Sequence, residues 1–171
     1  GRVHHATKMI SSKDNAAFRG FPMPSDYPTF PDHSALLRYL QYFSDVSGAT
    51  QAIAFRKEVA HLSFSEGRWN VGLSDEAQPR SYRGVVIATG HHREPNLPAW
   101  HDALDCPFIH SSEYKSREQV AGKRVLVVGP GNSGCDISAD AAAHALSVHH
   151  SMRSGVYIFP RRLLGLPMDA V

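Results

Sequence analysis

The stretch VLVVGPGNSGCD, residues 125–136, decides the fold of this chain. A run of apolar, β-forming residues meets three glycines, Gly129, Gly131 and Gly134, in a G-x-G-x-x-G pattern. The first glycine permits a tight turn, the second lets a diphosphate approach the backbone, and the third lets a helix pack closely on the strand. The pattern therefore predicts a dinucleotide-binding turn. A tight strand–helix turn that holds no ligand is the alternative.

The residues after the turn support the same hypothesis. A helix that begins here presents unpaired N–H groups and a partial positive charge, and both favour a phosphate. Asn132 and Ser133 lie at this helix N-terminus and are expected cofactor contacts. Asp136 is also counted among the expected contacts, since it either orients the turn or interacts favourably with the helix N-terminus.

The second strand of the βαβ unit predicted over residues 123–158 indicates which dinucleotide binds. A site for NAD normally has an acidic residue at the end of this strand, on the ribose 2′-hydroxyl. No acidic residue occurs between positions 147 and 155, whereas Ser151 and Arg153 do. Because a guanidinium pairs well with a phosphate, these two residues favour NADP. An ordinary solvated arginine at position 153 is the alternative.

Residues 1–47 show a different organisation. Residues 1–33 contain closely spaced prolines, and we expect an extended loop whose aromatic side chains are buried. Residues 34–47 predict a helix that Ser34 or Asp32 caps. The residues expected to face the core are Leu36, Leu37, Leu40 and Phe43.

Two further segments predict β-structure. Residues 51–73 alternate in hydrophobicity around a Ser-Glu-Gly turn, which predicts a hairpin or meander. GVVIATG, residues 84–90, is a continuous apolar run that ends in small residues, which predicts a buried strand. Residues 91–117 then form a linker or crossover.

Composition excludes several classes of protein. The 171 residues include 42% hydrophobic and 20% charged residues, with a formal net charge of +2. The small charge predicts no nucleic-acid partner, and no apolar run approaches the ~18 residues of a membrane span. Cys106 and Cys135 form no CxxC pair, so a reducing, cytoplasmic location is expected. The 11 histidines lack metal-ligand spacing, so we expect no metal.

Several segments, in order along the chain, resemble a known family. VLVVGPGNSGCDIS, residues 125–138, resembles the NADPH-binding turn of the class B flavoprotein monooxygenases, specifically the flavin-containing monooxygenases. Residues 11–43 are similar to that family's loop and helix after its first FAD-binding segment, and residues 85–98 contain its ATG turn. GRWNVGL, residues 67–73, and GVYIFPRRLLGLPMD, residues 155–169, also resemble the family.

The resemblance implies an α/β fold. This is the Rossmann-like architecture of flavoproteins with two dinucleotide-binding domains, here incomplete and with a β-meander. Residues 1–117 are expected to be a partial FAD-binding domain with the meander and crossover, and residues 118–171 the first half of an inserted NADPH-binding Rossmann domain. The family's own first FAD-binding glycine motif is absent from the chain, which begins at Gly1. We therefore expect an internal fragment of a longer protein.

The resemblance also implies the cofactors and their contacts. FAD and NADPH are expected, with a small-molecule substrate and O₂ as partners, and an oligomer is left open. The glycine turn, Ser151 and Arg153 would bind NADP. The expected FAD contacts are Ser11, Val59, Thr89 and Gly90.

Two departures from the family pattern concern possible catalytic residues. The fingerprint FxGxxxHxxxY/F falls on residues 104–114, where His110 and Tyr114 match while Leu104 and Cys106 replace its Phe and Gly. His110 is a candidate hinge or NADP contact, and a structural hydrogen-bonded histidine is the alternative. Ile10 occupies the position where the family often has an Asn beside the flavin. His110 and Ile10 are the only positions considered for a catalytic role, and neither is assigned one.

The activity implied is that of an N,N-dimethylaniline monooxygenase-like oxidoreductase. In the family, NADPH reduces FAD, the reduced flavin captures O₂ as a C4a-hydroperoxide, and this species oxygenates a soft nucleophile, an amine N or a sulfide S. A Baeyer–Villiger-type monooxygenase and another FAD/NAD(P) oxidoreductase are the enzymatic alternatives. A non-catalytic nucleotide-binding fragment is the alternative of another class.

Overall fold

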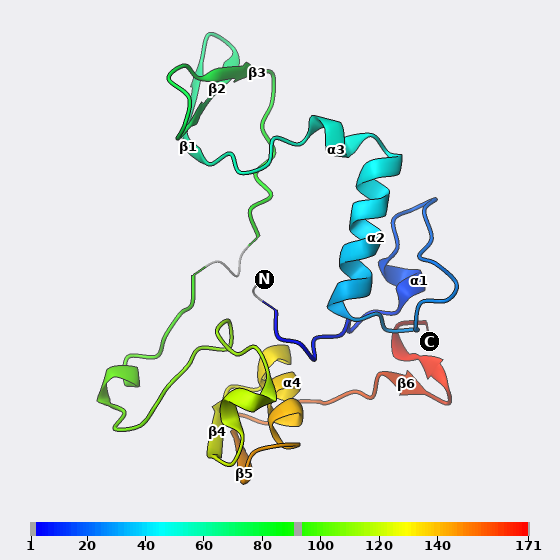
Figure 1. Ribbon diagram of the computed structural model, residues 1–171, viewed down its shortest axis with the longest axis vertical. Coiled ribbons are helices and arrows are strands. Elements are labelled where there is room, and N and C mark those ends of the chain that lie inside the picture. Colours follow the sequence, from blue (N-terminus) through cyan, green and yellow to red (C-terminus); the bar gives the residue numbers. More distant parts are fainter. Residues whose placement is uncertain (1–2, 91–93, 171) are drawn as a thin grey trace. The chain divides into compact units, whose positions relative to one another are not determined.

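The computed structural model describes residues 3–90 and 94–170. The chain divides into two compact units, Gly1–Phe43 together with Pro95–Val171, and Ser44–Glu94. Its helices and strands are α1 (Lys13–Ala16), α2 (His33–Val46), α3 (Ala49–Ala52), β1 (Val59–Ser65), β2 (Arg68–Leu73), β3 (Arg80–Tyr82), β4 (Arg124–Val128), α4 (Asn132–Ala141), β5 (Ser147–Ser151), β6 (Arg162–Leu163) and β7 (Leu166–Pro167). All of these except β7 are labelled in Figure 1. There are also 3₁₀ turns at His101–Ala103, Arg117–Val120 and Met168–Ala170.

The predicted βαβ unit is present. Strands β4 and β5 pair in parallel, from Arg124 opposite Ser147 to Val128 opposite Ser151, and α4 connects them. The inward valines of both strands pack against α4 and against the 3₁₀ turn that precedes β4. The buried cluster consists of Tyr114, Val120, Ile137 and Ala141, with Val125, Val127 and Val148 packed on it. The apolar residues of β4 and β5 thus form one face of a small sheet, and α4 covers that face.

Tyr114 joins the crossover segment to α4. Its side chain is 1% exposed, and its hydroxyl donates a hydrogen bond to Oδ2 of Asp140 at 2.8 Å. Burial, together with the neighbouring Asp140 carboxylate, raises the pKa of Tyr114 well above its usual value of 10.0. The phenol therefore stays neutral and remains a donor at any physiological pH.

One side of helix α2 packs on the proline-rich loop in residues 1–33. Asp32 caps the helix, as predicted, because Oδ1 accepts hydrogen bonds from the N–H groups of Ser34 at 3.0 Å and Ala35 at 2.8 Å. These bonds lower the pKa of the Asp32 carboxyl. The hydroxyl of Tyr39 accepts from the N–H of Phe18 at 2.8 Å and donates to the carbonyl of Phe21 at 2.7 Å.

The core face of α2 differs from the prediction. Ala35 and Tyr39 are buried, whereas Leu37 and Leu40 are 55% and 42% exposed. The aromatic loop residues stack against Tyr39 and Phe43, which lie four residues apart on one side of the helix. The loop's rings therefore decide which side is covered, and the leucines lie outside that stripe.

The predicted meander forms the centre of the unit Ser44–Glu94. Strands β1, β2 and β3 are antiparallel neighbours in sequence order. The β1–β2 turn is the dipeptide Glu66-Gly67 with φ of 52° and 72°, the left-handed pair that a two-residue hairpin turn requires. Beside β3, Glu76 pairs with Arg80 at 2.5 Å and with Lys57 at 3.1 Å, and these partners lower the pKa of Glu76 to about 2.

The buried strand predicted over residues 84–90 is wrong. This stretch belongs to no sheet, and Val86 and Ile87 are 90% and 74% exposed. A parallel strand forms only where neighbouring strands satisfy its backbone groups. Within residues 3–90 and 94–170, no strand pairs with it. The apolar run alone therefore did not suffice to predict a strand here.

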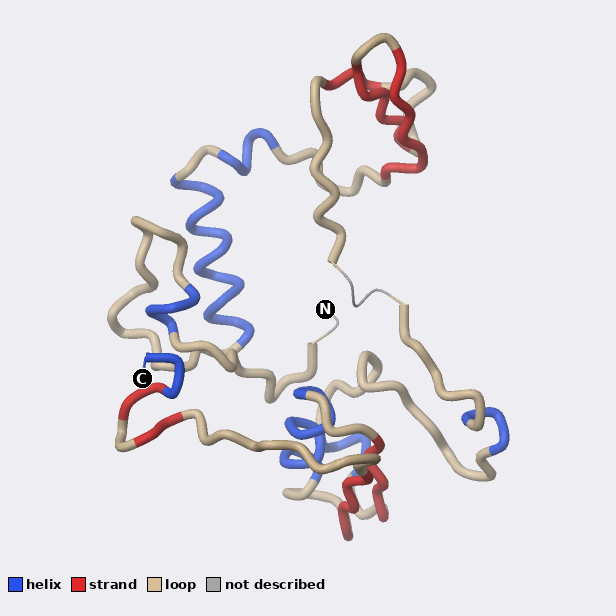
Figure 2. The backbone as a smooth tube through the Cα atoms, turned by 180° about the vertical axis from the view of Figure 1, so that it is seen from behind, coloured by secondary structure: helices blue, strands red, loops and turns tan. Residues whose placement is uncertain are grey.

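A short hairpin near the C-terminus, which the sequence did not predict, contacts the N-terminal segment. Strands β6 and β7 pair, and the carboxylate of Asp169 accepts a hydrogen bond from the N–H of Ser12 at 2.7 Å. The guanidinium of Arg162 donates to Oγ1 of Thr29 at 2.7 Å. The two views of the backbone show these segments side by side (Figures 1 and 2). Residues more than 130 positions apart thus close one unit.

Replacing Tyr39 with phenylalanine tests the link between α2 and the loop. The N–H of Phe18 and the carbonyl of Phe21 lose their partner, so we expect the free energy of unfolding to fall by about 1–3 kcal/mol. Urea unfolding measures this change, and hydrogen exchange should show faster exchange at the Phe18 amide. Tyr42→Phe is the matched control, since Tyr42 is 59% exposed on the same helix. Equal effects of the two variants would contradict the assignment.

Candidate functional site

The glycine turn after β4 is fixed by backbone contacts to β5. Gly129 has a φ of 105°, which a residue with a Cβ rarely adopts. Its N–H donates to the carbonyl oxygen of Ser151 at 3.0 Å, continuing the parallel ladder by one bond. The turn therefore leaves the sheet at its carboxyl edge, where ligands bind in open α/β sheets.

Gly134 is required by close packing inside the turn. A Cβ at this position would collide with the carbonyl oxygen of Gly129 and would lie 3.3 Å from Nε2 of His150. Helix α4 thus approaches the end of β4 so closely that only glycine fits. This is the helix–strand contact that the third glycine of the motif predicts.

Gly131 has no such internal reason to be glycine. Its φ of −66° suits any residue, and a Cβ there would meet nothing within 4 Å. It is the N-cap of α4 and makes no side-chain cap, while the first helical bond runs from the N–H of Cys135 to its carbonyl at 3.0 Å. The N–H groups of Asn132, Ser133 and Gly134 precede that bond and have no acceptor within the helix. The N–H groups at the start of α4 are therefore not capped by a side chain, and the turn beside them at Gly131 borders open space.

His150 is a member of this site that the sequence interpretation missed. Its Nε2 lies 2.8 Å from the carbonyl oxygen of Gly129. The alternation along β5 could have found it, because Val148 packs on α4 and the side chain two residues on must share that face. The sequence interpretation instead considered the histidines together, as residues without metal-ligand spacing.

The other predicted NADP contacts lie at the end of β5 and on α4. Ser151 is the last residue of β5, and Arg153 follows it, exposed to solvent. Asp136 lies 3.7 Å from a guanidinium nitrogen of Arg161, both side chains being partly exposed. Asp136 therefore has a partner outside the turn, which neither sequence-based role for it included.

His110 forms a local turn with Ser112. Its Nδ1 accepts the N–H of Ser112 at 3.2 Å and lies 2.9 Å from the hydroxyl of the same residue. Because Nδ1 accepts, the proton of the neutral ring is on Nε2. Ile10 is 59% exposed, and Ser11 is half-buried beside the Ser12–Asp169 contact.

Three predicted FAD contacts belong to the unit Ser44–Glu94. Val59 begins β1 and lines a hollow of about 330 Å³ beside the meander, together with Val71, Leu73 and Val85. Thr89 and Gly90 are exposed and lie in irregular chain. Ser11 and the glycine turn belong to the other unit.

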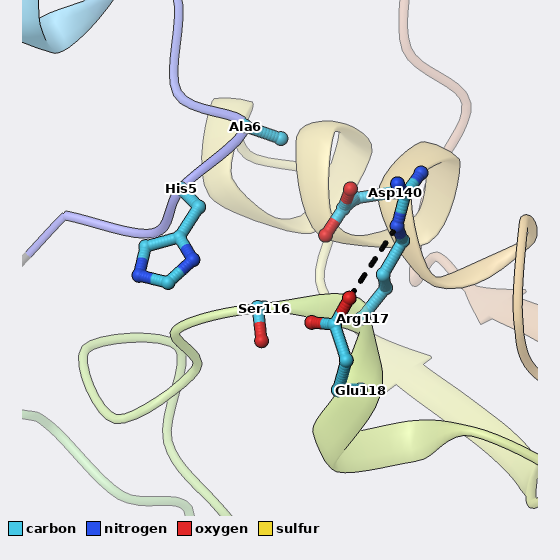
Figure 3. A pocket seen from close by; sticks show the side chains of 6 residues that line it. All are labelled: His5, Ala6, Ser116, Arg117, Glu118 and Asp140. Carbon is cyan, nitrogen blue, oxygen red and sulfur yellow. Dashed lines mark ion pairs between the residues drawn. The ribbon is translucent and has the colours of Figure 1, made fainter.

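A second hollow lies at the opposite end of α4 from the glycine turn. It measures about 290 Å³ and is lined by His5, Ala6, Ser116, Arg117, Glu118 and Asp140, shown in Figure 3. Arg117 pairs with Glu118 at 3.8 Å, and Asp140 already accepts the Tyr114 hydroxyl. The charged groups thus have partners within the chain, and no reaction is assigned to this hollow.

Residues 3–90 and 94–170 contain neither a grouping of metal ligands nor a membrane-spanning helix. No set of three or more histidine, cysteine or acidic side chains there is grouped so that it could hold a metal ion. No helix in the same ranges has both the length and the apolar character that crossing a membrane requires.

Comparison with known proteins gives consistent matches along the chain. The family model described as FMO-like, flavin-binding monooxygenase-like, matches residues 1–171. Indole-3-pyruvate monooxygenase YUCCA1 of Oryza sativa subsp. japonica is 36% identical over 148 residues, covering 85% of this chain and 36% of that protein. The N-oxide-forming dimethylaniline monooxygenase 2 of Macaca mulatta is 32% identical over 181 residues, covering 99% and 34%.

A solved structure confirms the fold class. The structure of S-allyl-L-cysteine S-oxygenase from Allium sativum superposes with a TM-score of 0.83 at 24% identity, covering 97% of this chain and 40% of that one. The α/β flavoprotein architecture predicted from sequence is therefore confirmed. The chain spans about a third of the length of the curated relatives it matches.

Substituting Gly134 with alanine tests the packing of the turn. The new methyl group meets a backbone oxygen, so α4 or the turn must shift, and we expect a loss of about 3 kcal/mol in the free energy of unfolding. Gly131→Ala is the matched control, because its methyl group would enter open space, and it should lower stability by no more than about 1 kcal/mol, the difference between glycine and alanine at an N-cap. Urea unfolding of the two variants decides the point. Comparable losses in both would mean that the turn does not pack as described.

Proposed function

The chain belongs to the flavin-binding monooxygenase-like family, and we propose that it supplies the NADP-binding turn and part of the FAD-binding domain of an oxygenating enzyme. Residues 118–171 would hold the start of the NADPH domain, and residues 1–117 the FAD-domain portion. The observation that carries the proposal is the open turn at Gly131, with the first N–H groups of α4, which no side chain caps, behind it.

The turn fits the diphosphate of NADP. A serine or aspartate at the N-cap would use its side chain on the helix N–H groups, whereas Gly131 leaves them available to an outside acceptor. The absent Cβ leaves room for a phosphate to approach the backbone. Asn132 and Ser133 would add side-chain contacts, and the positive end of the α4 dipole would favour the negative charge.

Selectivity for NADP over NAD would come from the end of β5. Arg153 is exposed two residues beyond that strand, where the adenosine ribose of a dinucleotide lies in this fold. Its guanidinium would pair with the 2′-phosphate, and the Ser151 hydroxyl would add a hydrogen bond. The lack of an acidic residue over positions 147–155 removes the usual partner of the NAD 2′-hydroxyl.

FAD would contact the remaining predicted residues. Val59 already lines a hollow of about 330 Å³ whose walls are largely apolar but include Lys57 and Arg80, and we infer that it takes a flat aromatic ring such as adenine. Thr89 and Gly90 are exposed and available. In the other unit the predicted FAD contact is Ser11, next to Ser12, whose N–H donates to Asp169.

When bound, NADPH supplies a hydride and FAD supplies oxygen activation, and the chain's residues supply binding and orientation. Relatives are named for dimethylaniline N-oxide formation and for S-oxygenation of S-allyl-L-cysteine. We therefore infer a soft nucleophile, an amine nitrogen or a sulfide sulfur, as the substrate class. The rice relative is named for indole-3-pyruvate, a carbonyl compound, which makes a carbonyl substrate the second candidate.

Binding of NADP⁺ and NAD⁺, compared by calorimetry, tests the role of Arg153. We expect NADP⁺ to bind more tightly, and Arg153→Ala to weaken NADP⁺ binding by about 10- to 100-fold while leaving NAD⁺ unchanged, since a hydrogen bond to a charged group contributes about 1.5–3 kcal/mol. Arg83→Ala, at an exposed arginine of the other unit, is the control. An equal loss for both dinucleotides would remove the assignment of Arg153 to the 2′-phosphate.

Gly131→Ala tests whether a diphosphate approaches the turn. Its methyl group would occupy the space that the diphosphate needs, so we expect at least about a tenfold loss of affinity for NADP⁺ and for NAD⁺ alike. Calorimetry on the folded variant measures this loss. Unchanged affinity would place the dinucleotide elsewhere, and the turn would then be a structural turn only.

A further inference from the structure

We propose that His150 is a positioning residue for the glycine turn. Its imidazole N–H holds the carbonyl of Gly129 between β5 and α4, and so keeps the turn in the conformation that binds a dinucleotide diphosphate. The proposal rests on the proposed function of the turn and adds to it a residue outside the glycine motif.

Two adjacent residues of β5 hold both polar groups of Gly129. The carbonyl of Ser151 accepts the Gly129 N–H at 3.0 Å, and Nε2 of His150 lies 2.8 Å from the Gly129 carbonyl oxygen. The first contact is ordinary sheet pairing, whereas the second needs a side chain that can donate. The orientation of the peptide group after Gly129 therefore depends on the residue at position 150.

The direction of the His150 bond follows from its acceptor. A carbonyl oxygen only accepts, so Nε2 carries the proton. The neutral ring is then the Nε2–H tautomer, and the protonated ring also donates from Nε2. His150 is therefore the donor of this bond and the Gly129 carbonyl its acceptor.

The Gly129 carbonyl needs a donor where it lies. It points toward Gly134, where a Cβ would collide with it, so it is enclosed between the strand end and the first turn of α4. A carbonyl enclosed without a partner is costly. Because glycine moves easily between backbone conformations, loss of the donor would let this peptide group rotate. The turn would then lose the conformation in which the N–H groups at the start of α4 are open to a phosphate.

The neighbouring histidine provides a matched control. His149 precedes His150 in β5, pairs with Leu126 across the ladder, and is exposed, whereas His150 is half-buried. Successive residues of a strand point to opposite faces. A change at His149 thus alters the composition of the same strand without touching the turn.

Three variants of the full chain test whether the turn needs the N–H donor of His150 or only the volume of its side chain. His150→Leu removes the donor and keeps an apolar side chain of moderate size, His150→Gln retains a side-chain N–H, and His149→Leu is the control. NADP⁺ affinity is measured by calorimetry, and the amide signals of residues 129–134 are followed by NMR. We expect about a tenfold loss of affinity and shifted turn amides in His150→Leu, recovery of most of the affinity in His150→Gln, and no change in His149→Leu.

The nitrogen signals of the histidine ring give a readout independent of binding. We expect Nε2 of His150 to carry a hydrogen-bonded proton in the wild-type chain with no dinucleotide added. An unprotonated Nε2 in the neutral ring would overturn the inference, and this measurement decides the matter even if His150→Leu fails to fold. Wild-type affinity retained by His150→Leu would overturn the inference alone. Failure of the wild type to bind NADP⁺ would overturn the proposed function and, with it, the effect of His150 on affinity.

Discussion

The close approach of α4 to the end of β4 is the constraint on which the rest of the site depends. At Gly134 the helix lies against the carbonyl oxygen of Gly129, with no space for a single methyl group. This contact fixes where α4 begins and which of its N–H groups stay unpaired. The same carbonyl oxygen lies 2.8 Å from Nε2 of His150 on β5. One packing requirement thus produces the open donors, the conformation of the turn and the need for an extra hydrogen bond.

Helix α4 is held at both ends by side chains from neighbouring segments. At its start, His150 on β5 contacts the turn through Gly129. In its last turn, Asp140 accepts the hydroxyl of the buried Tyr114. Tyr114 is one of the two fingerprint residues that match the family pattern, and its contacts in this chain are those of an anchor for the helix. A short helix with a modest apolar face is stabilised mainly by such tertiary contacts, since its intrinsic propensity contributes little.

The sequence predicted the features that depend on residues close together in the chain, and it missed those that depend on residues far apart. The glycine turn, the βαβ unit and the meander were predictable, because periodicity and turn residues act over a few positions. The strand over residues 84–90 failed, because an apolar run becomes a strand only with partners that the run itself does not encode. The contact of Asp169 with Ser12 joins residues 157 positions apart, and no pattern in the chain indicates it. His150 lies between these cases, since strand alternation placed it on the helix face but nothing pointed to Gly129.

The segment around Arg161 contacts both α4 and the proline-rich loop. Arg161 lies near Asp136 on α4 and over the ring of Phe30 in the proline-rich loop, while the adjacent Arg162 donates to Thr29. The same stretch therefore touches the helix that starts at the proposed NADP site and the loop that follows the proposed FAD contact Ser11. Each contact is partly exposed and individually weak. Their value is geometric, because a stretch attached to both segments limits how far either cofactor contact can move without the other.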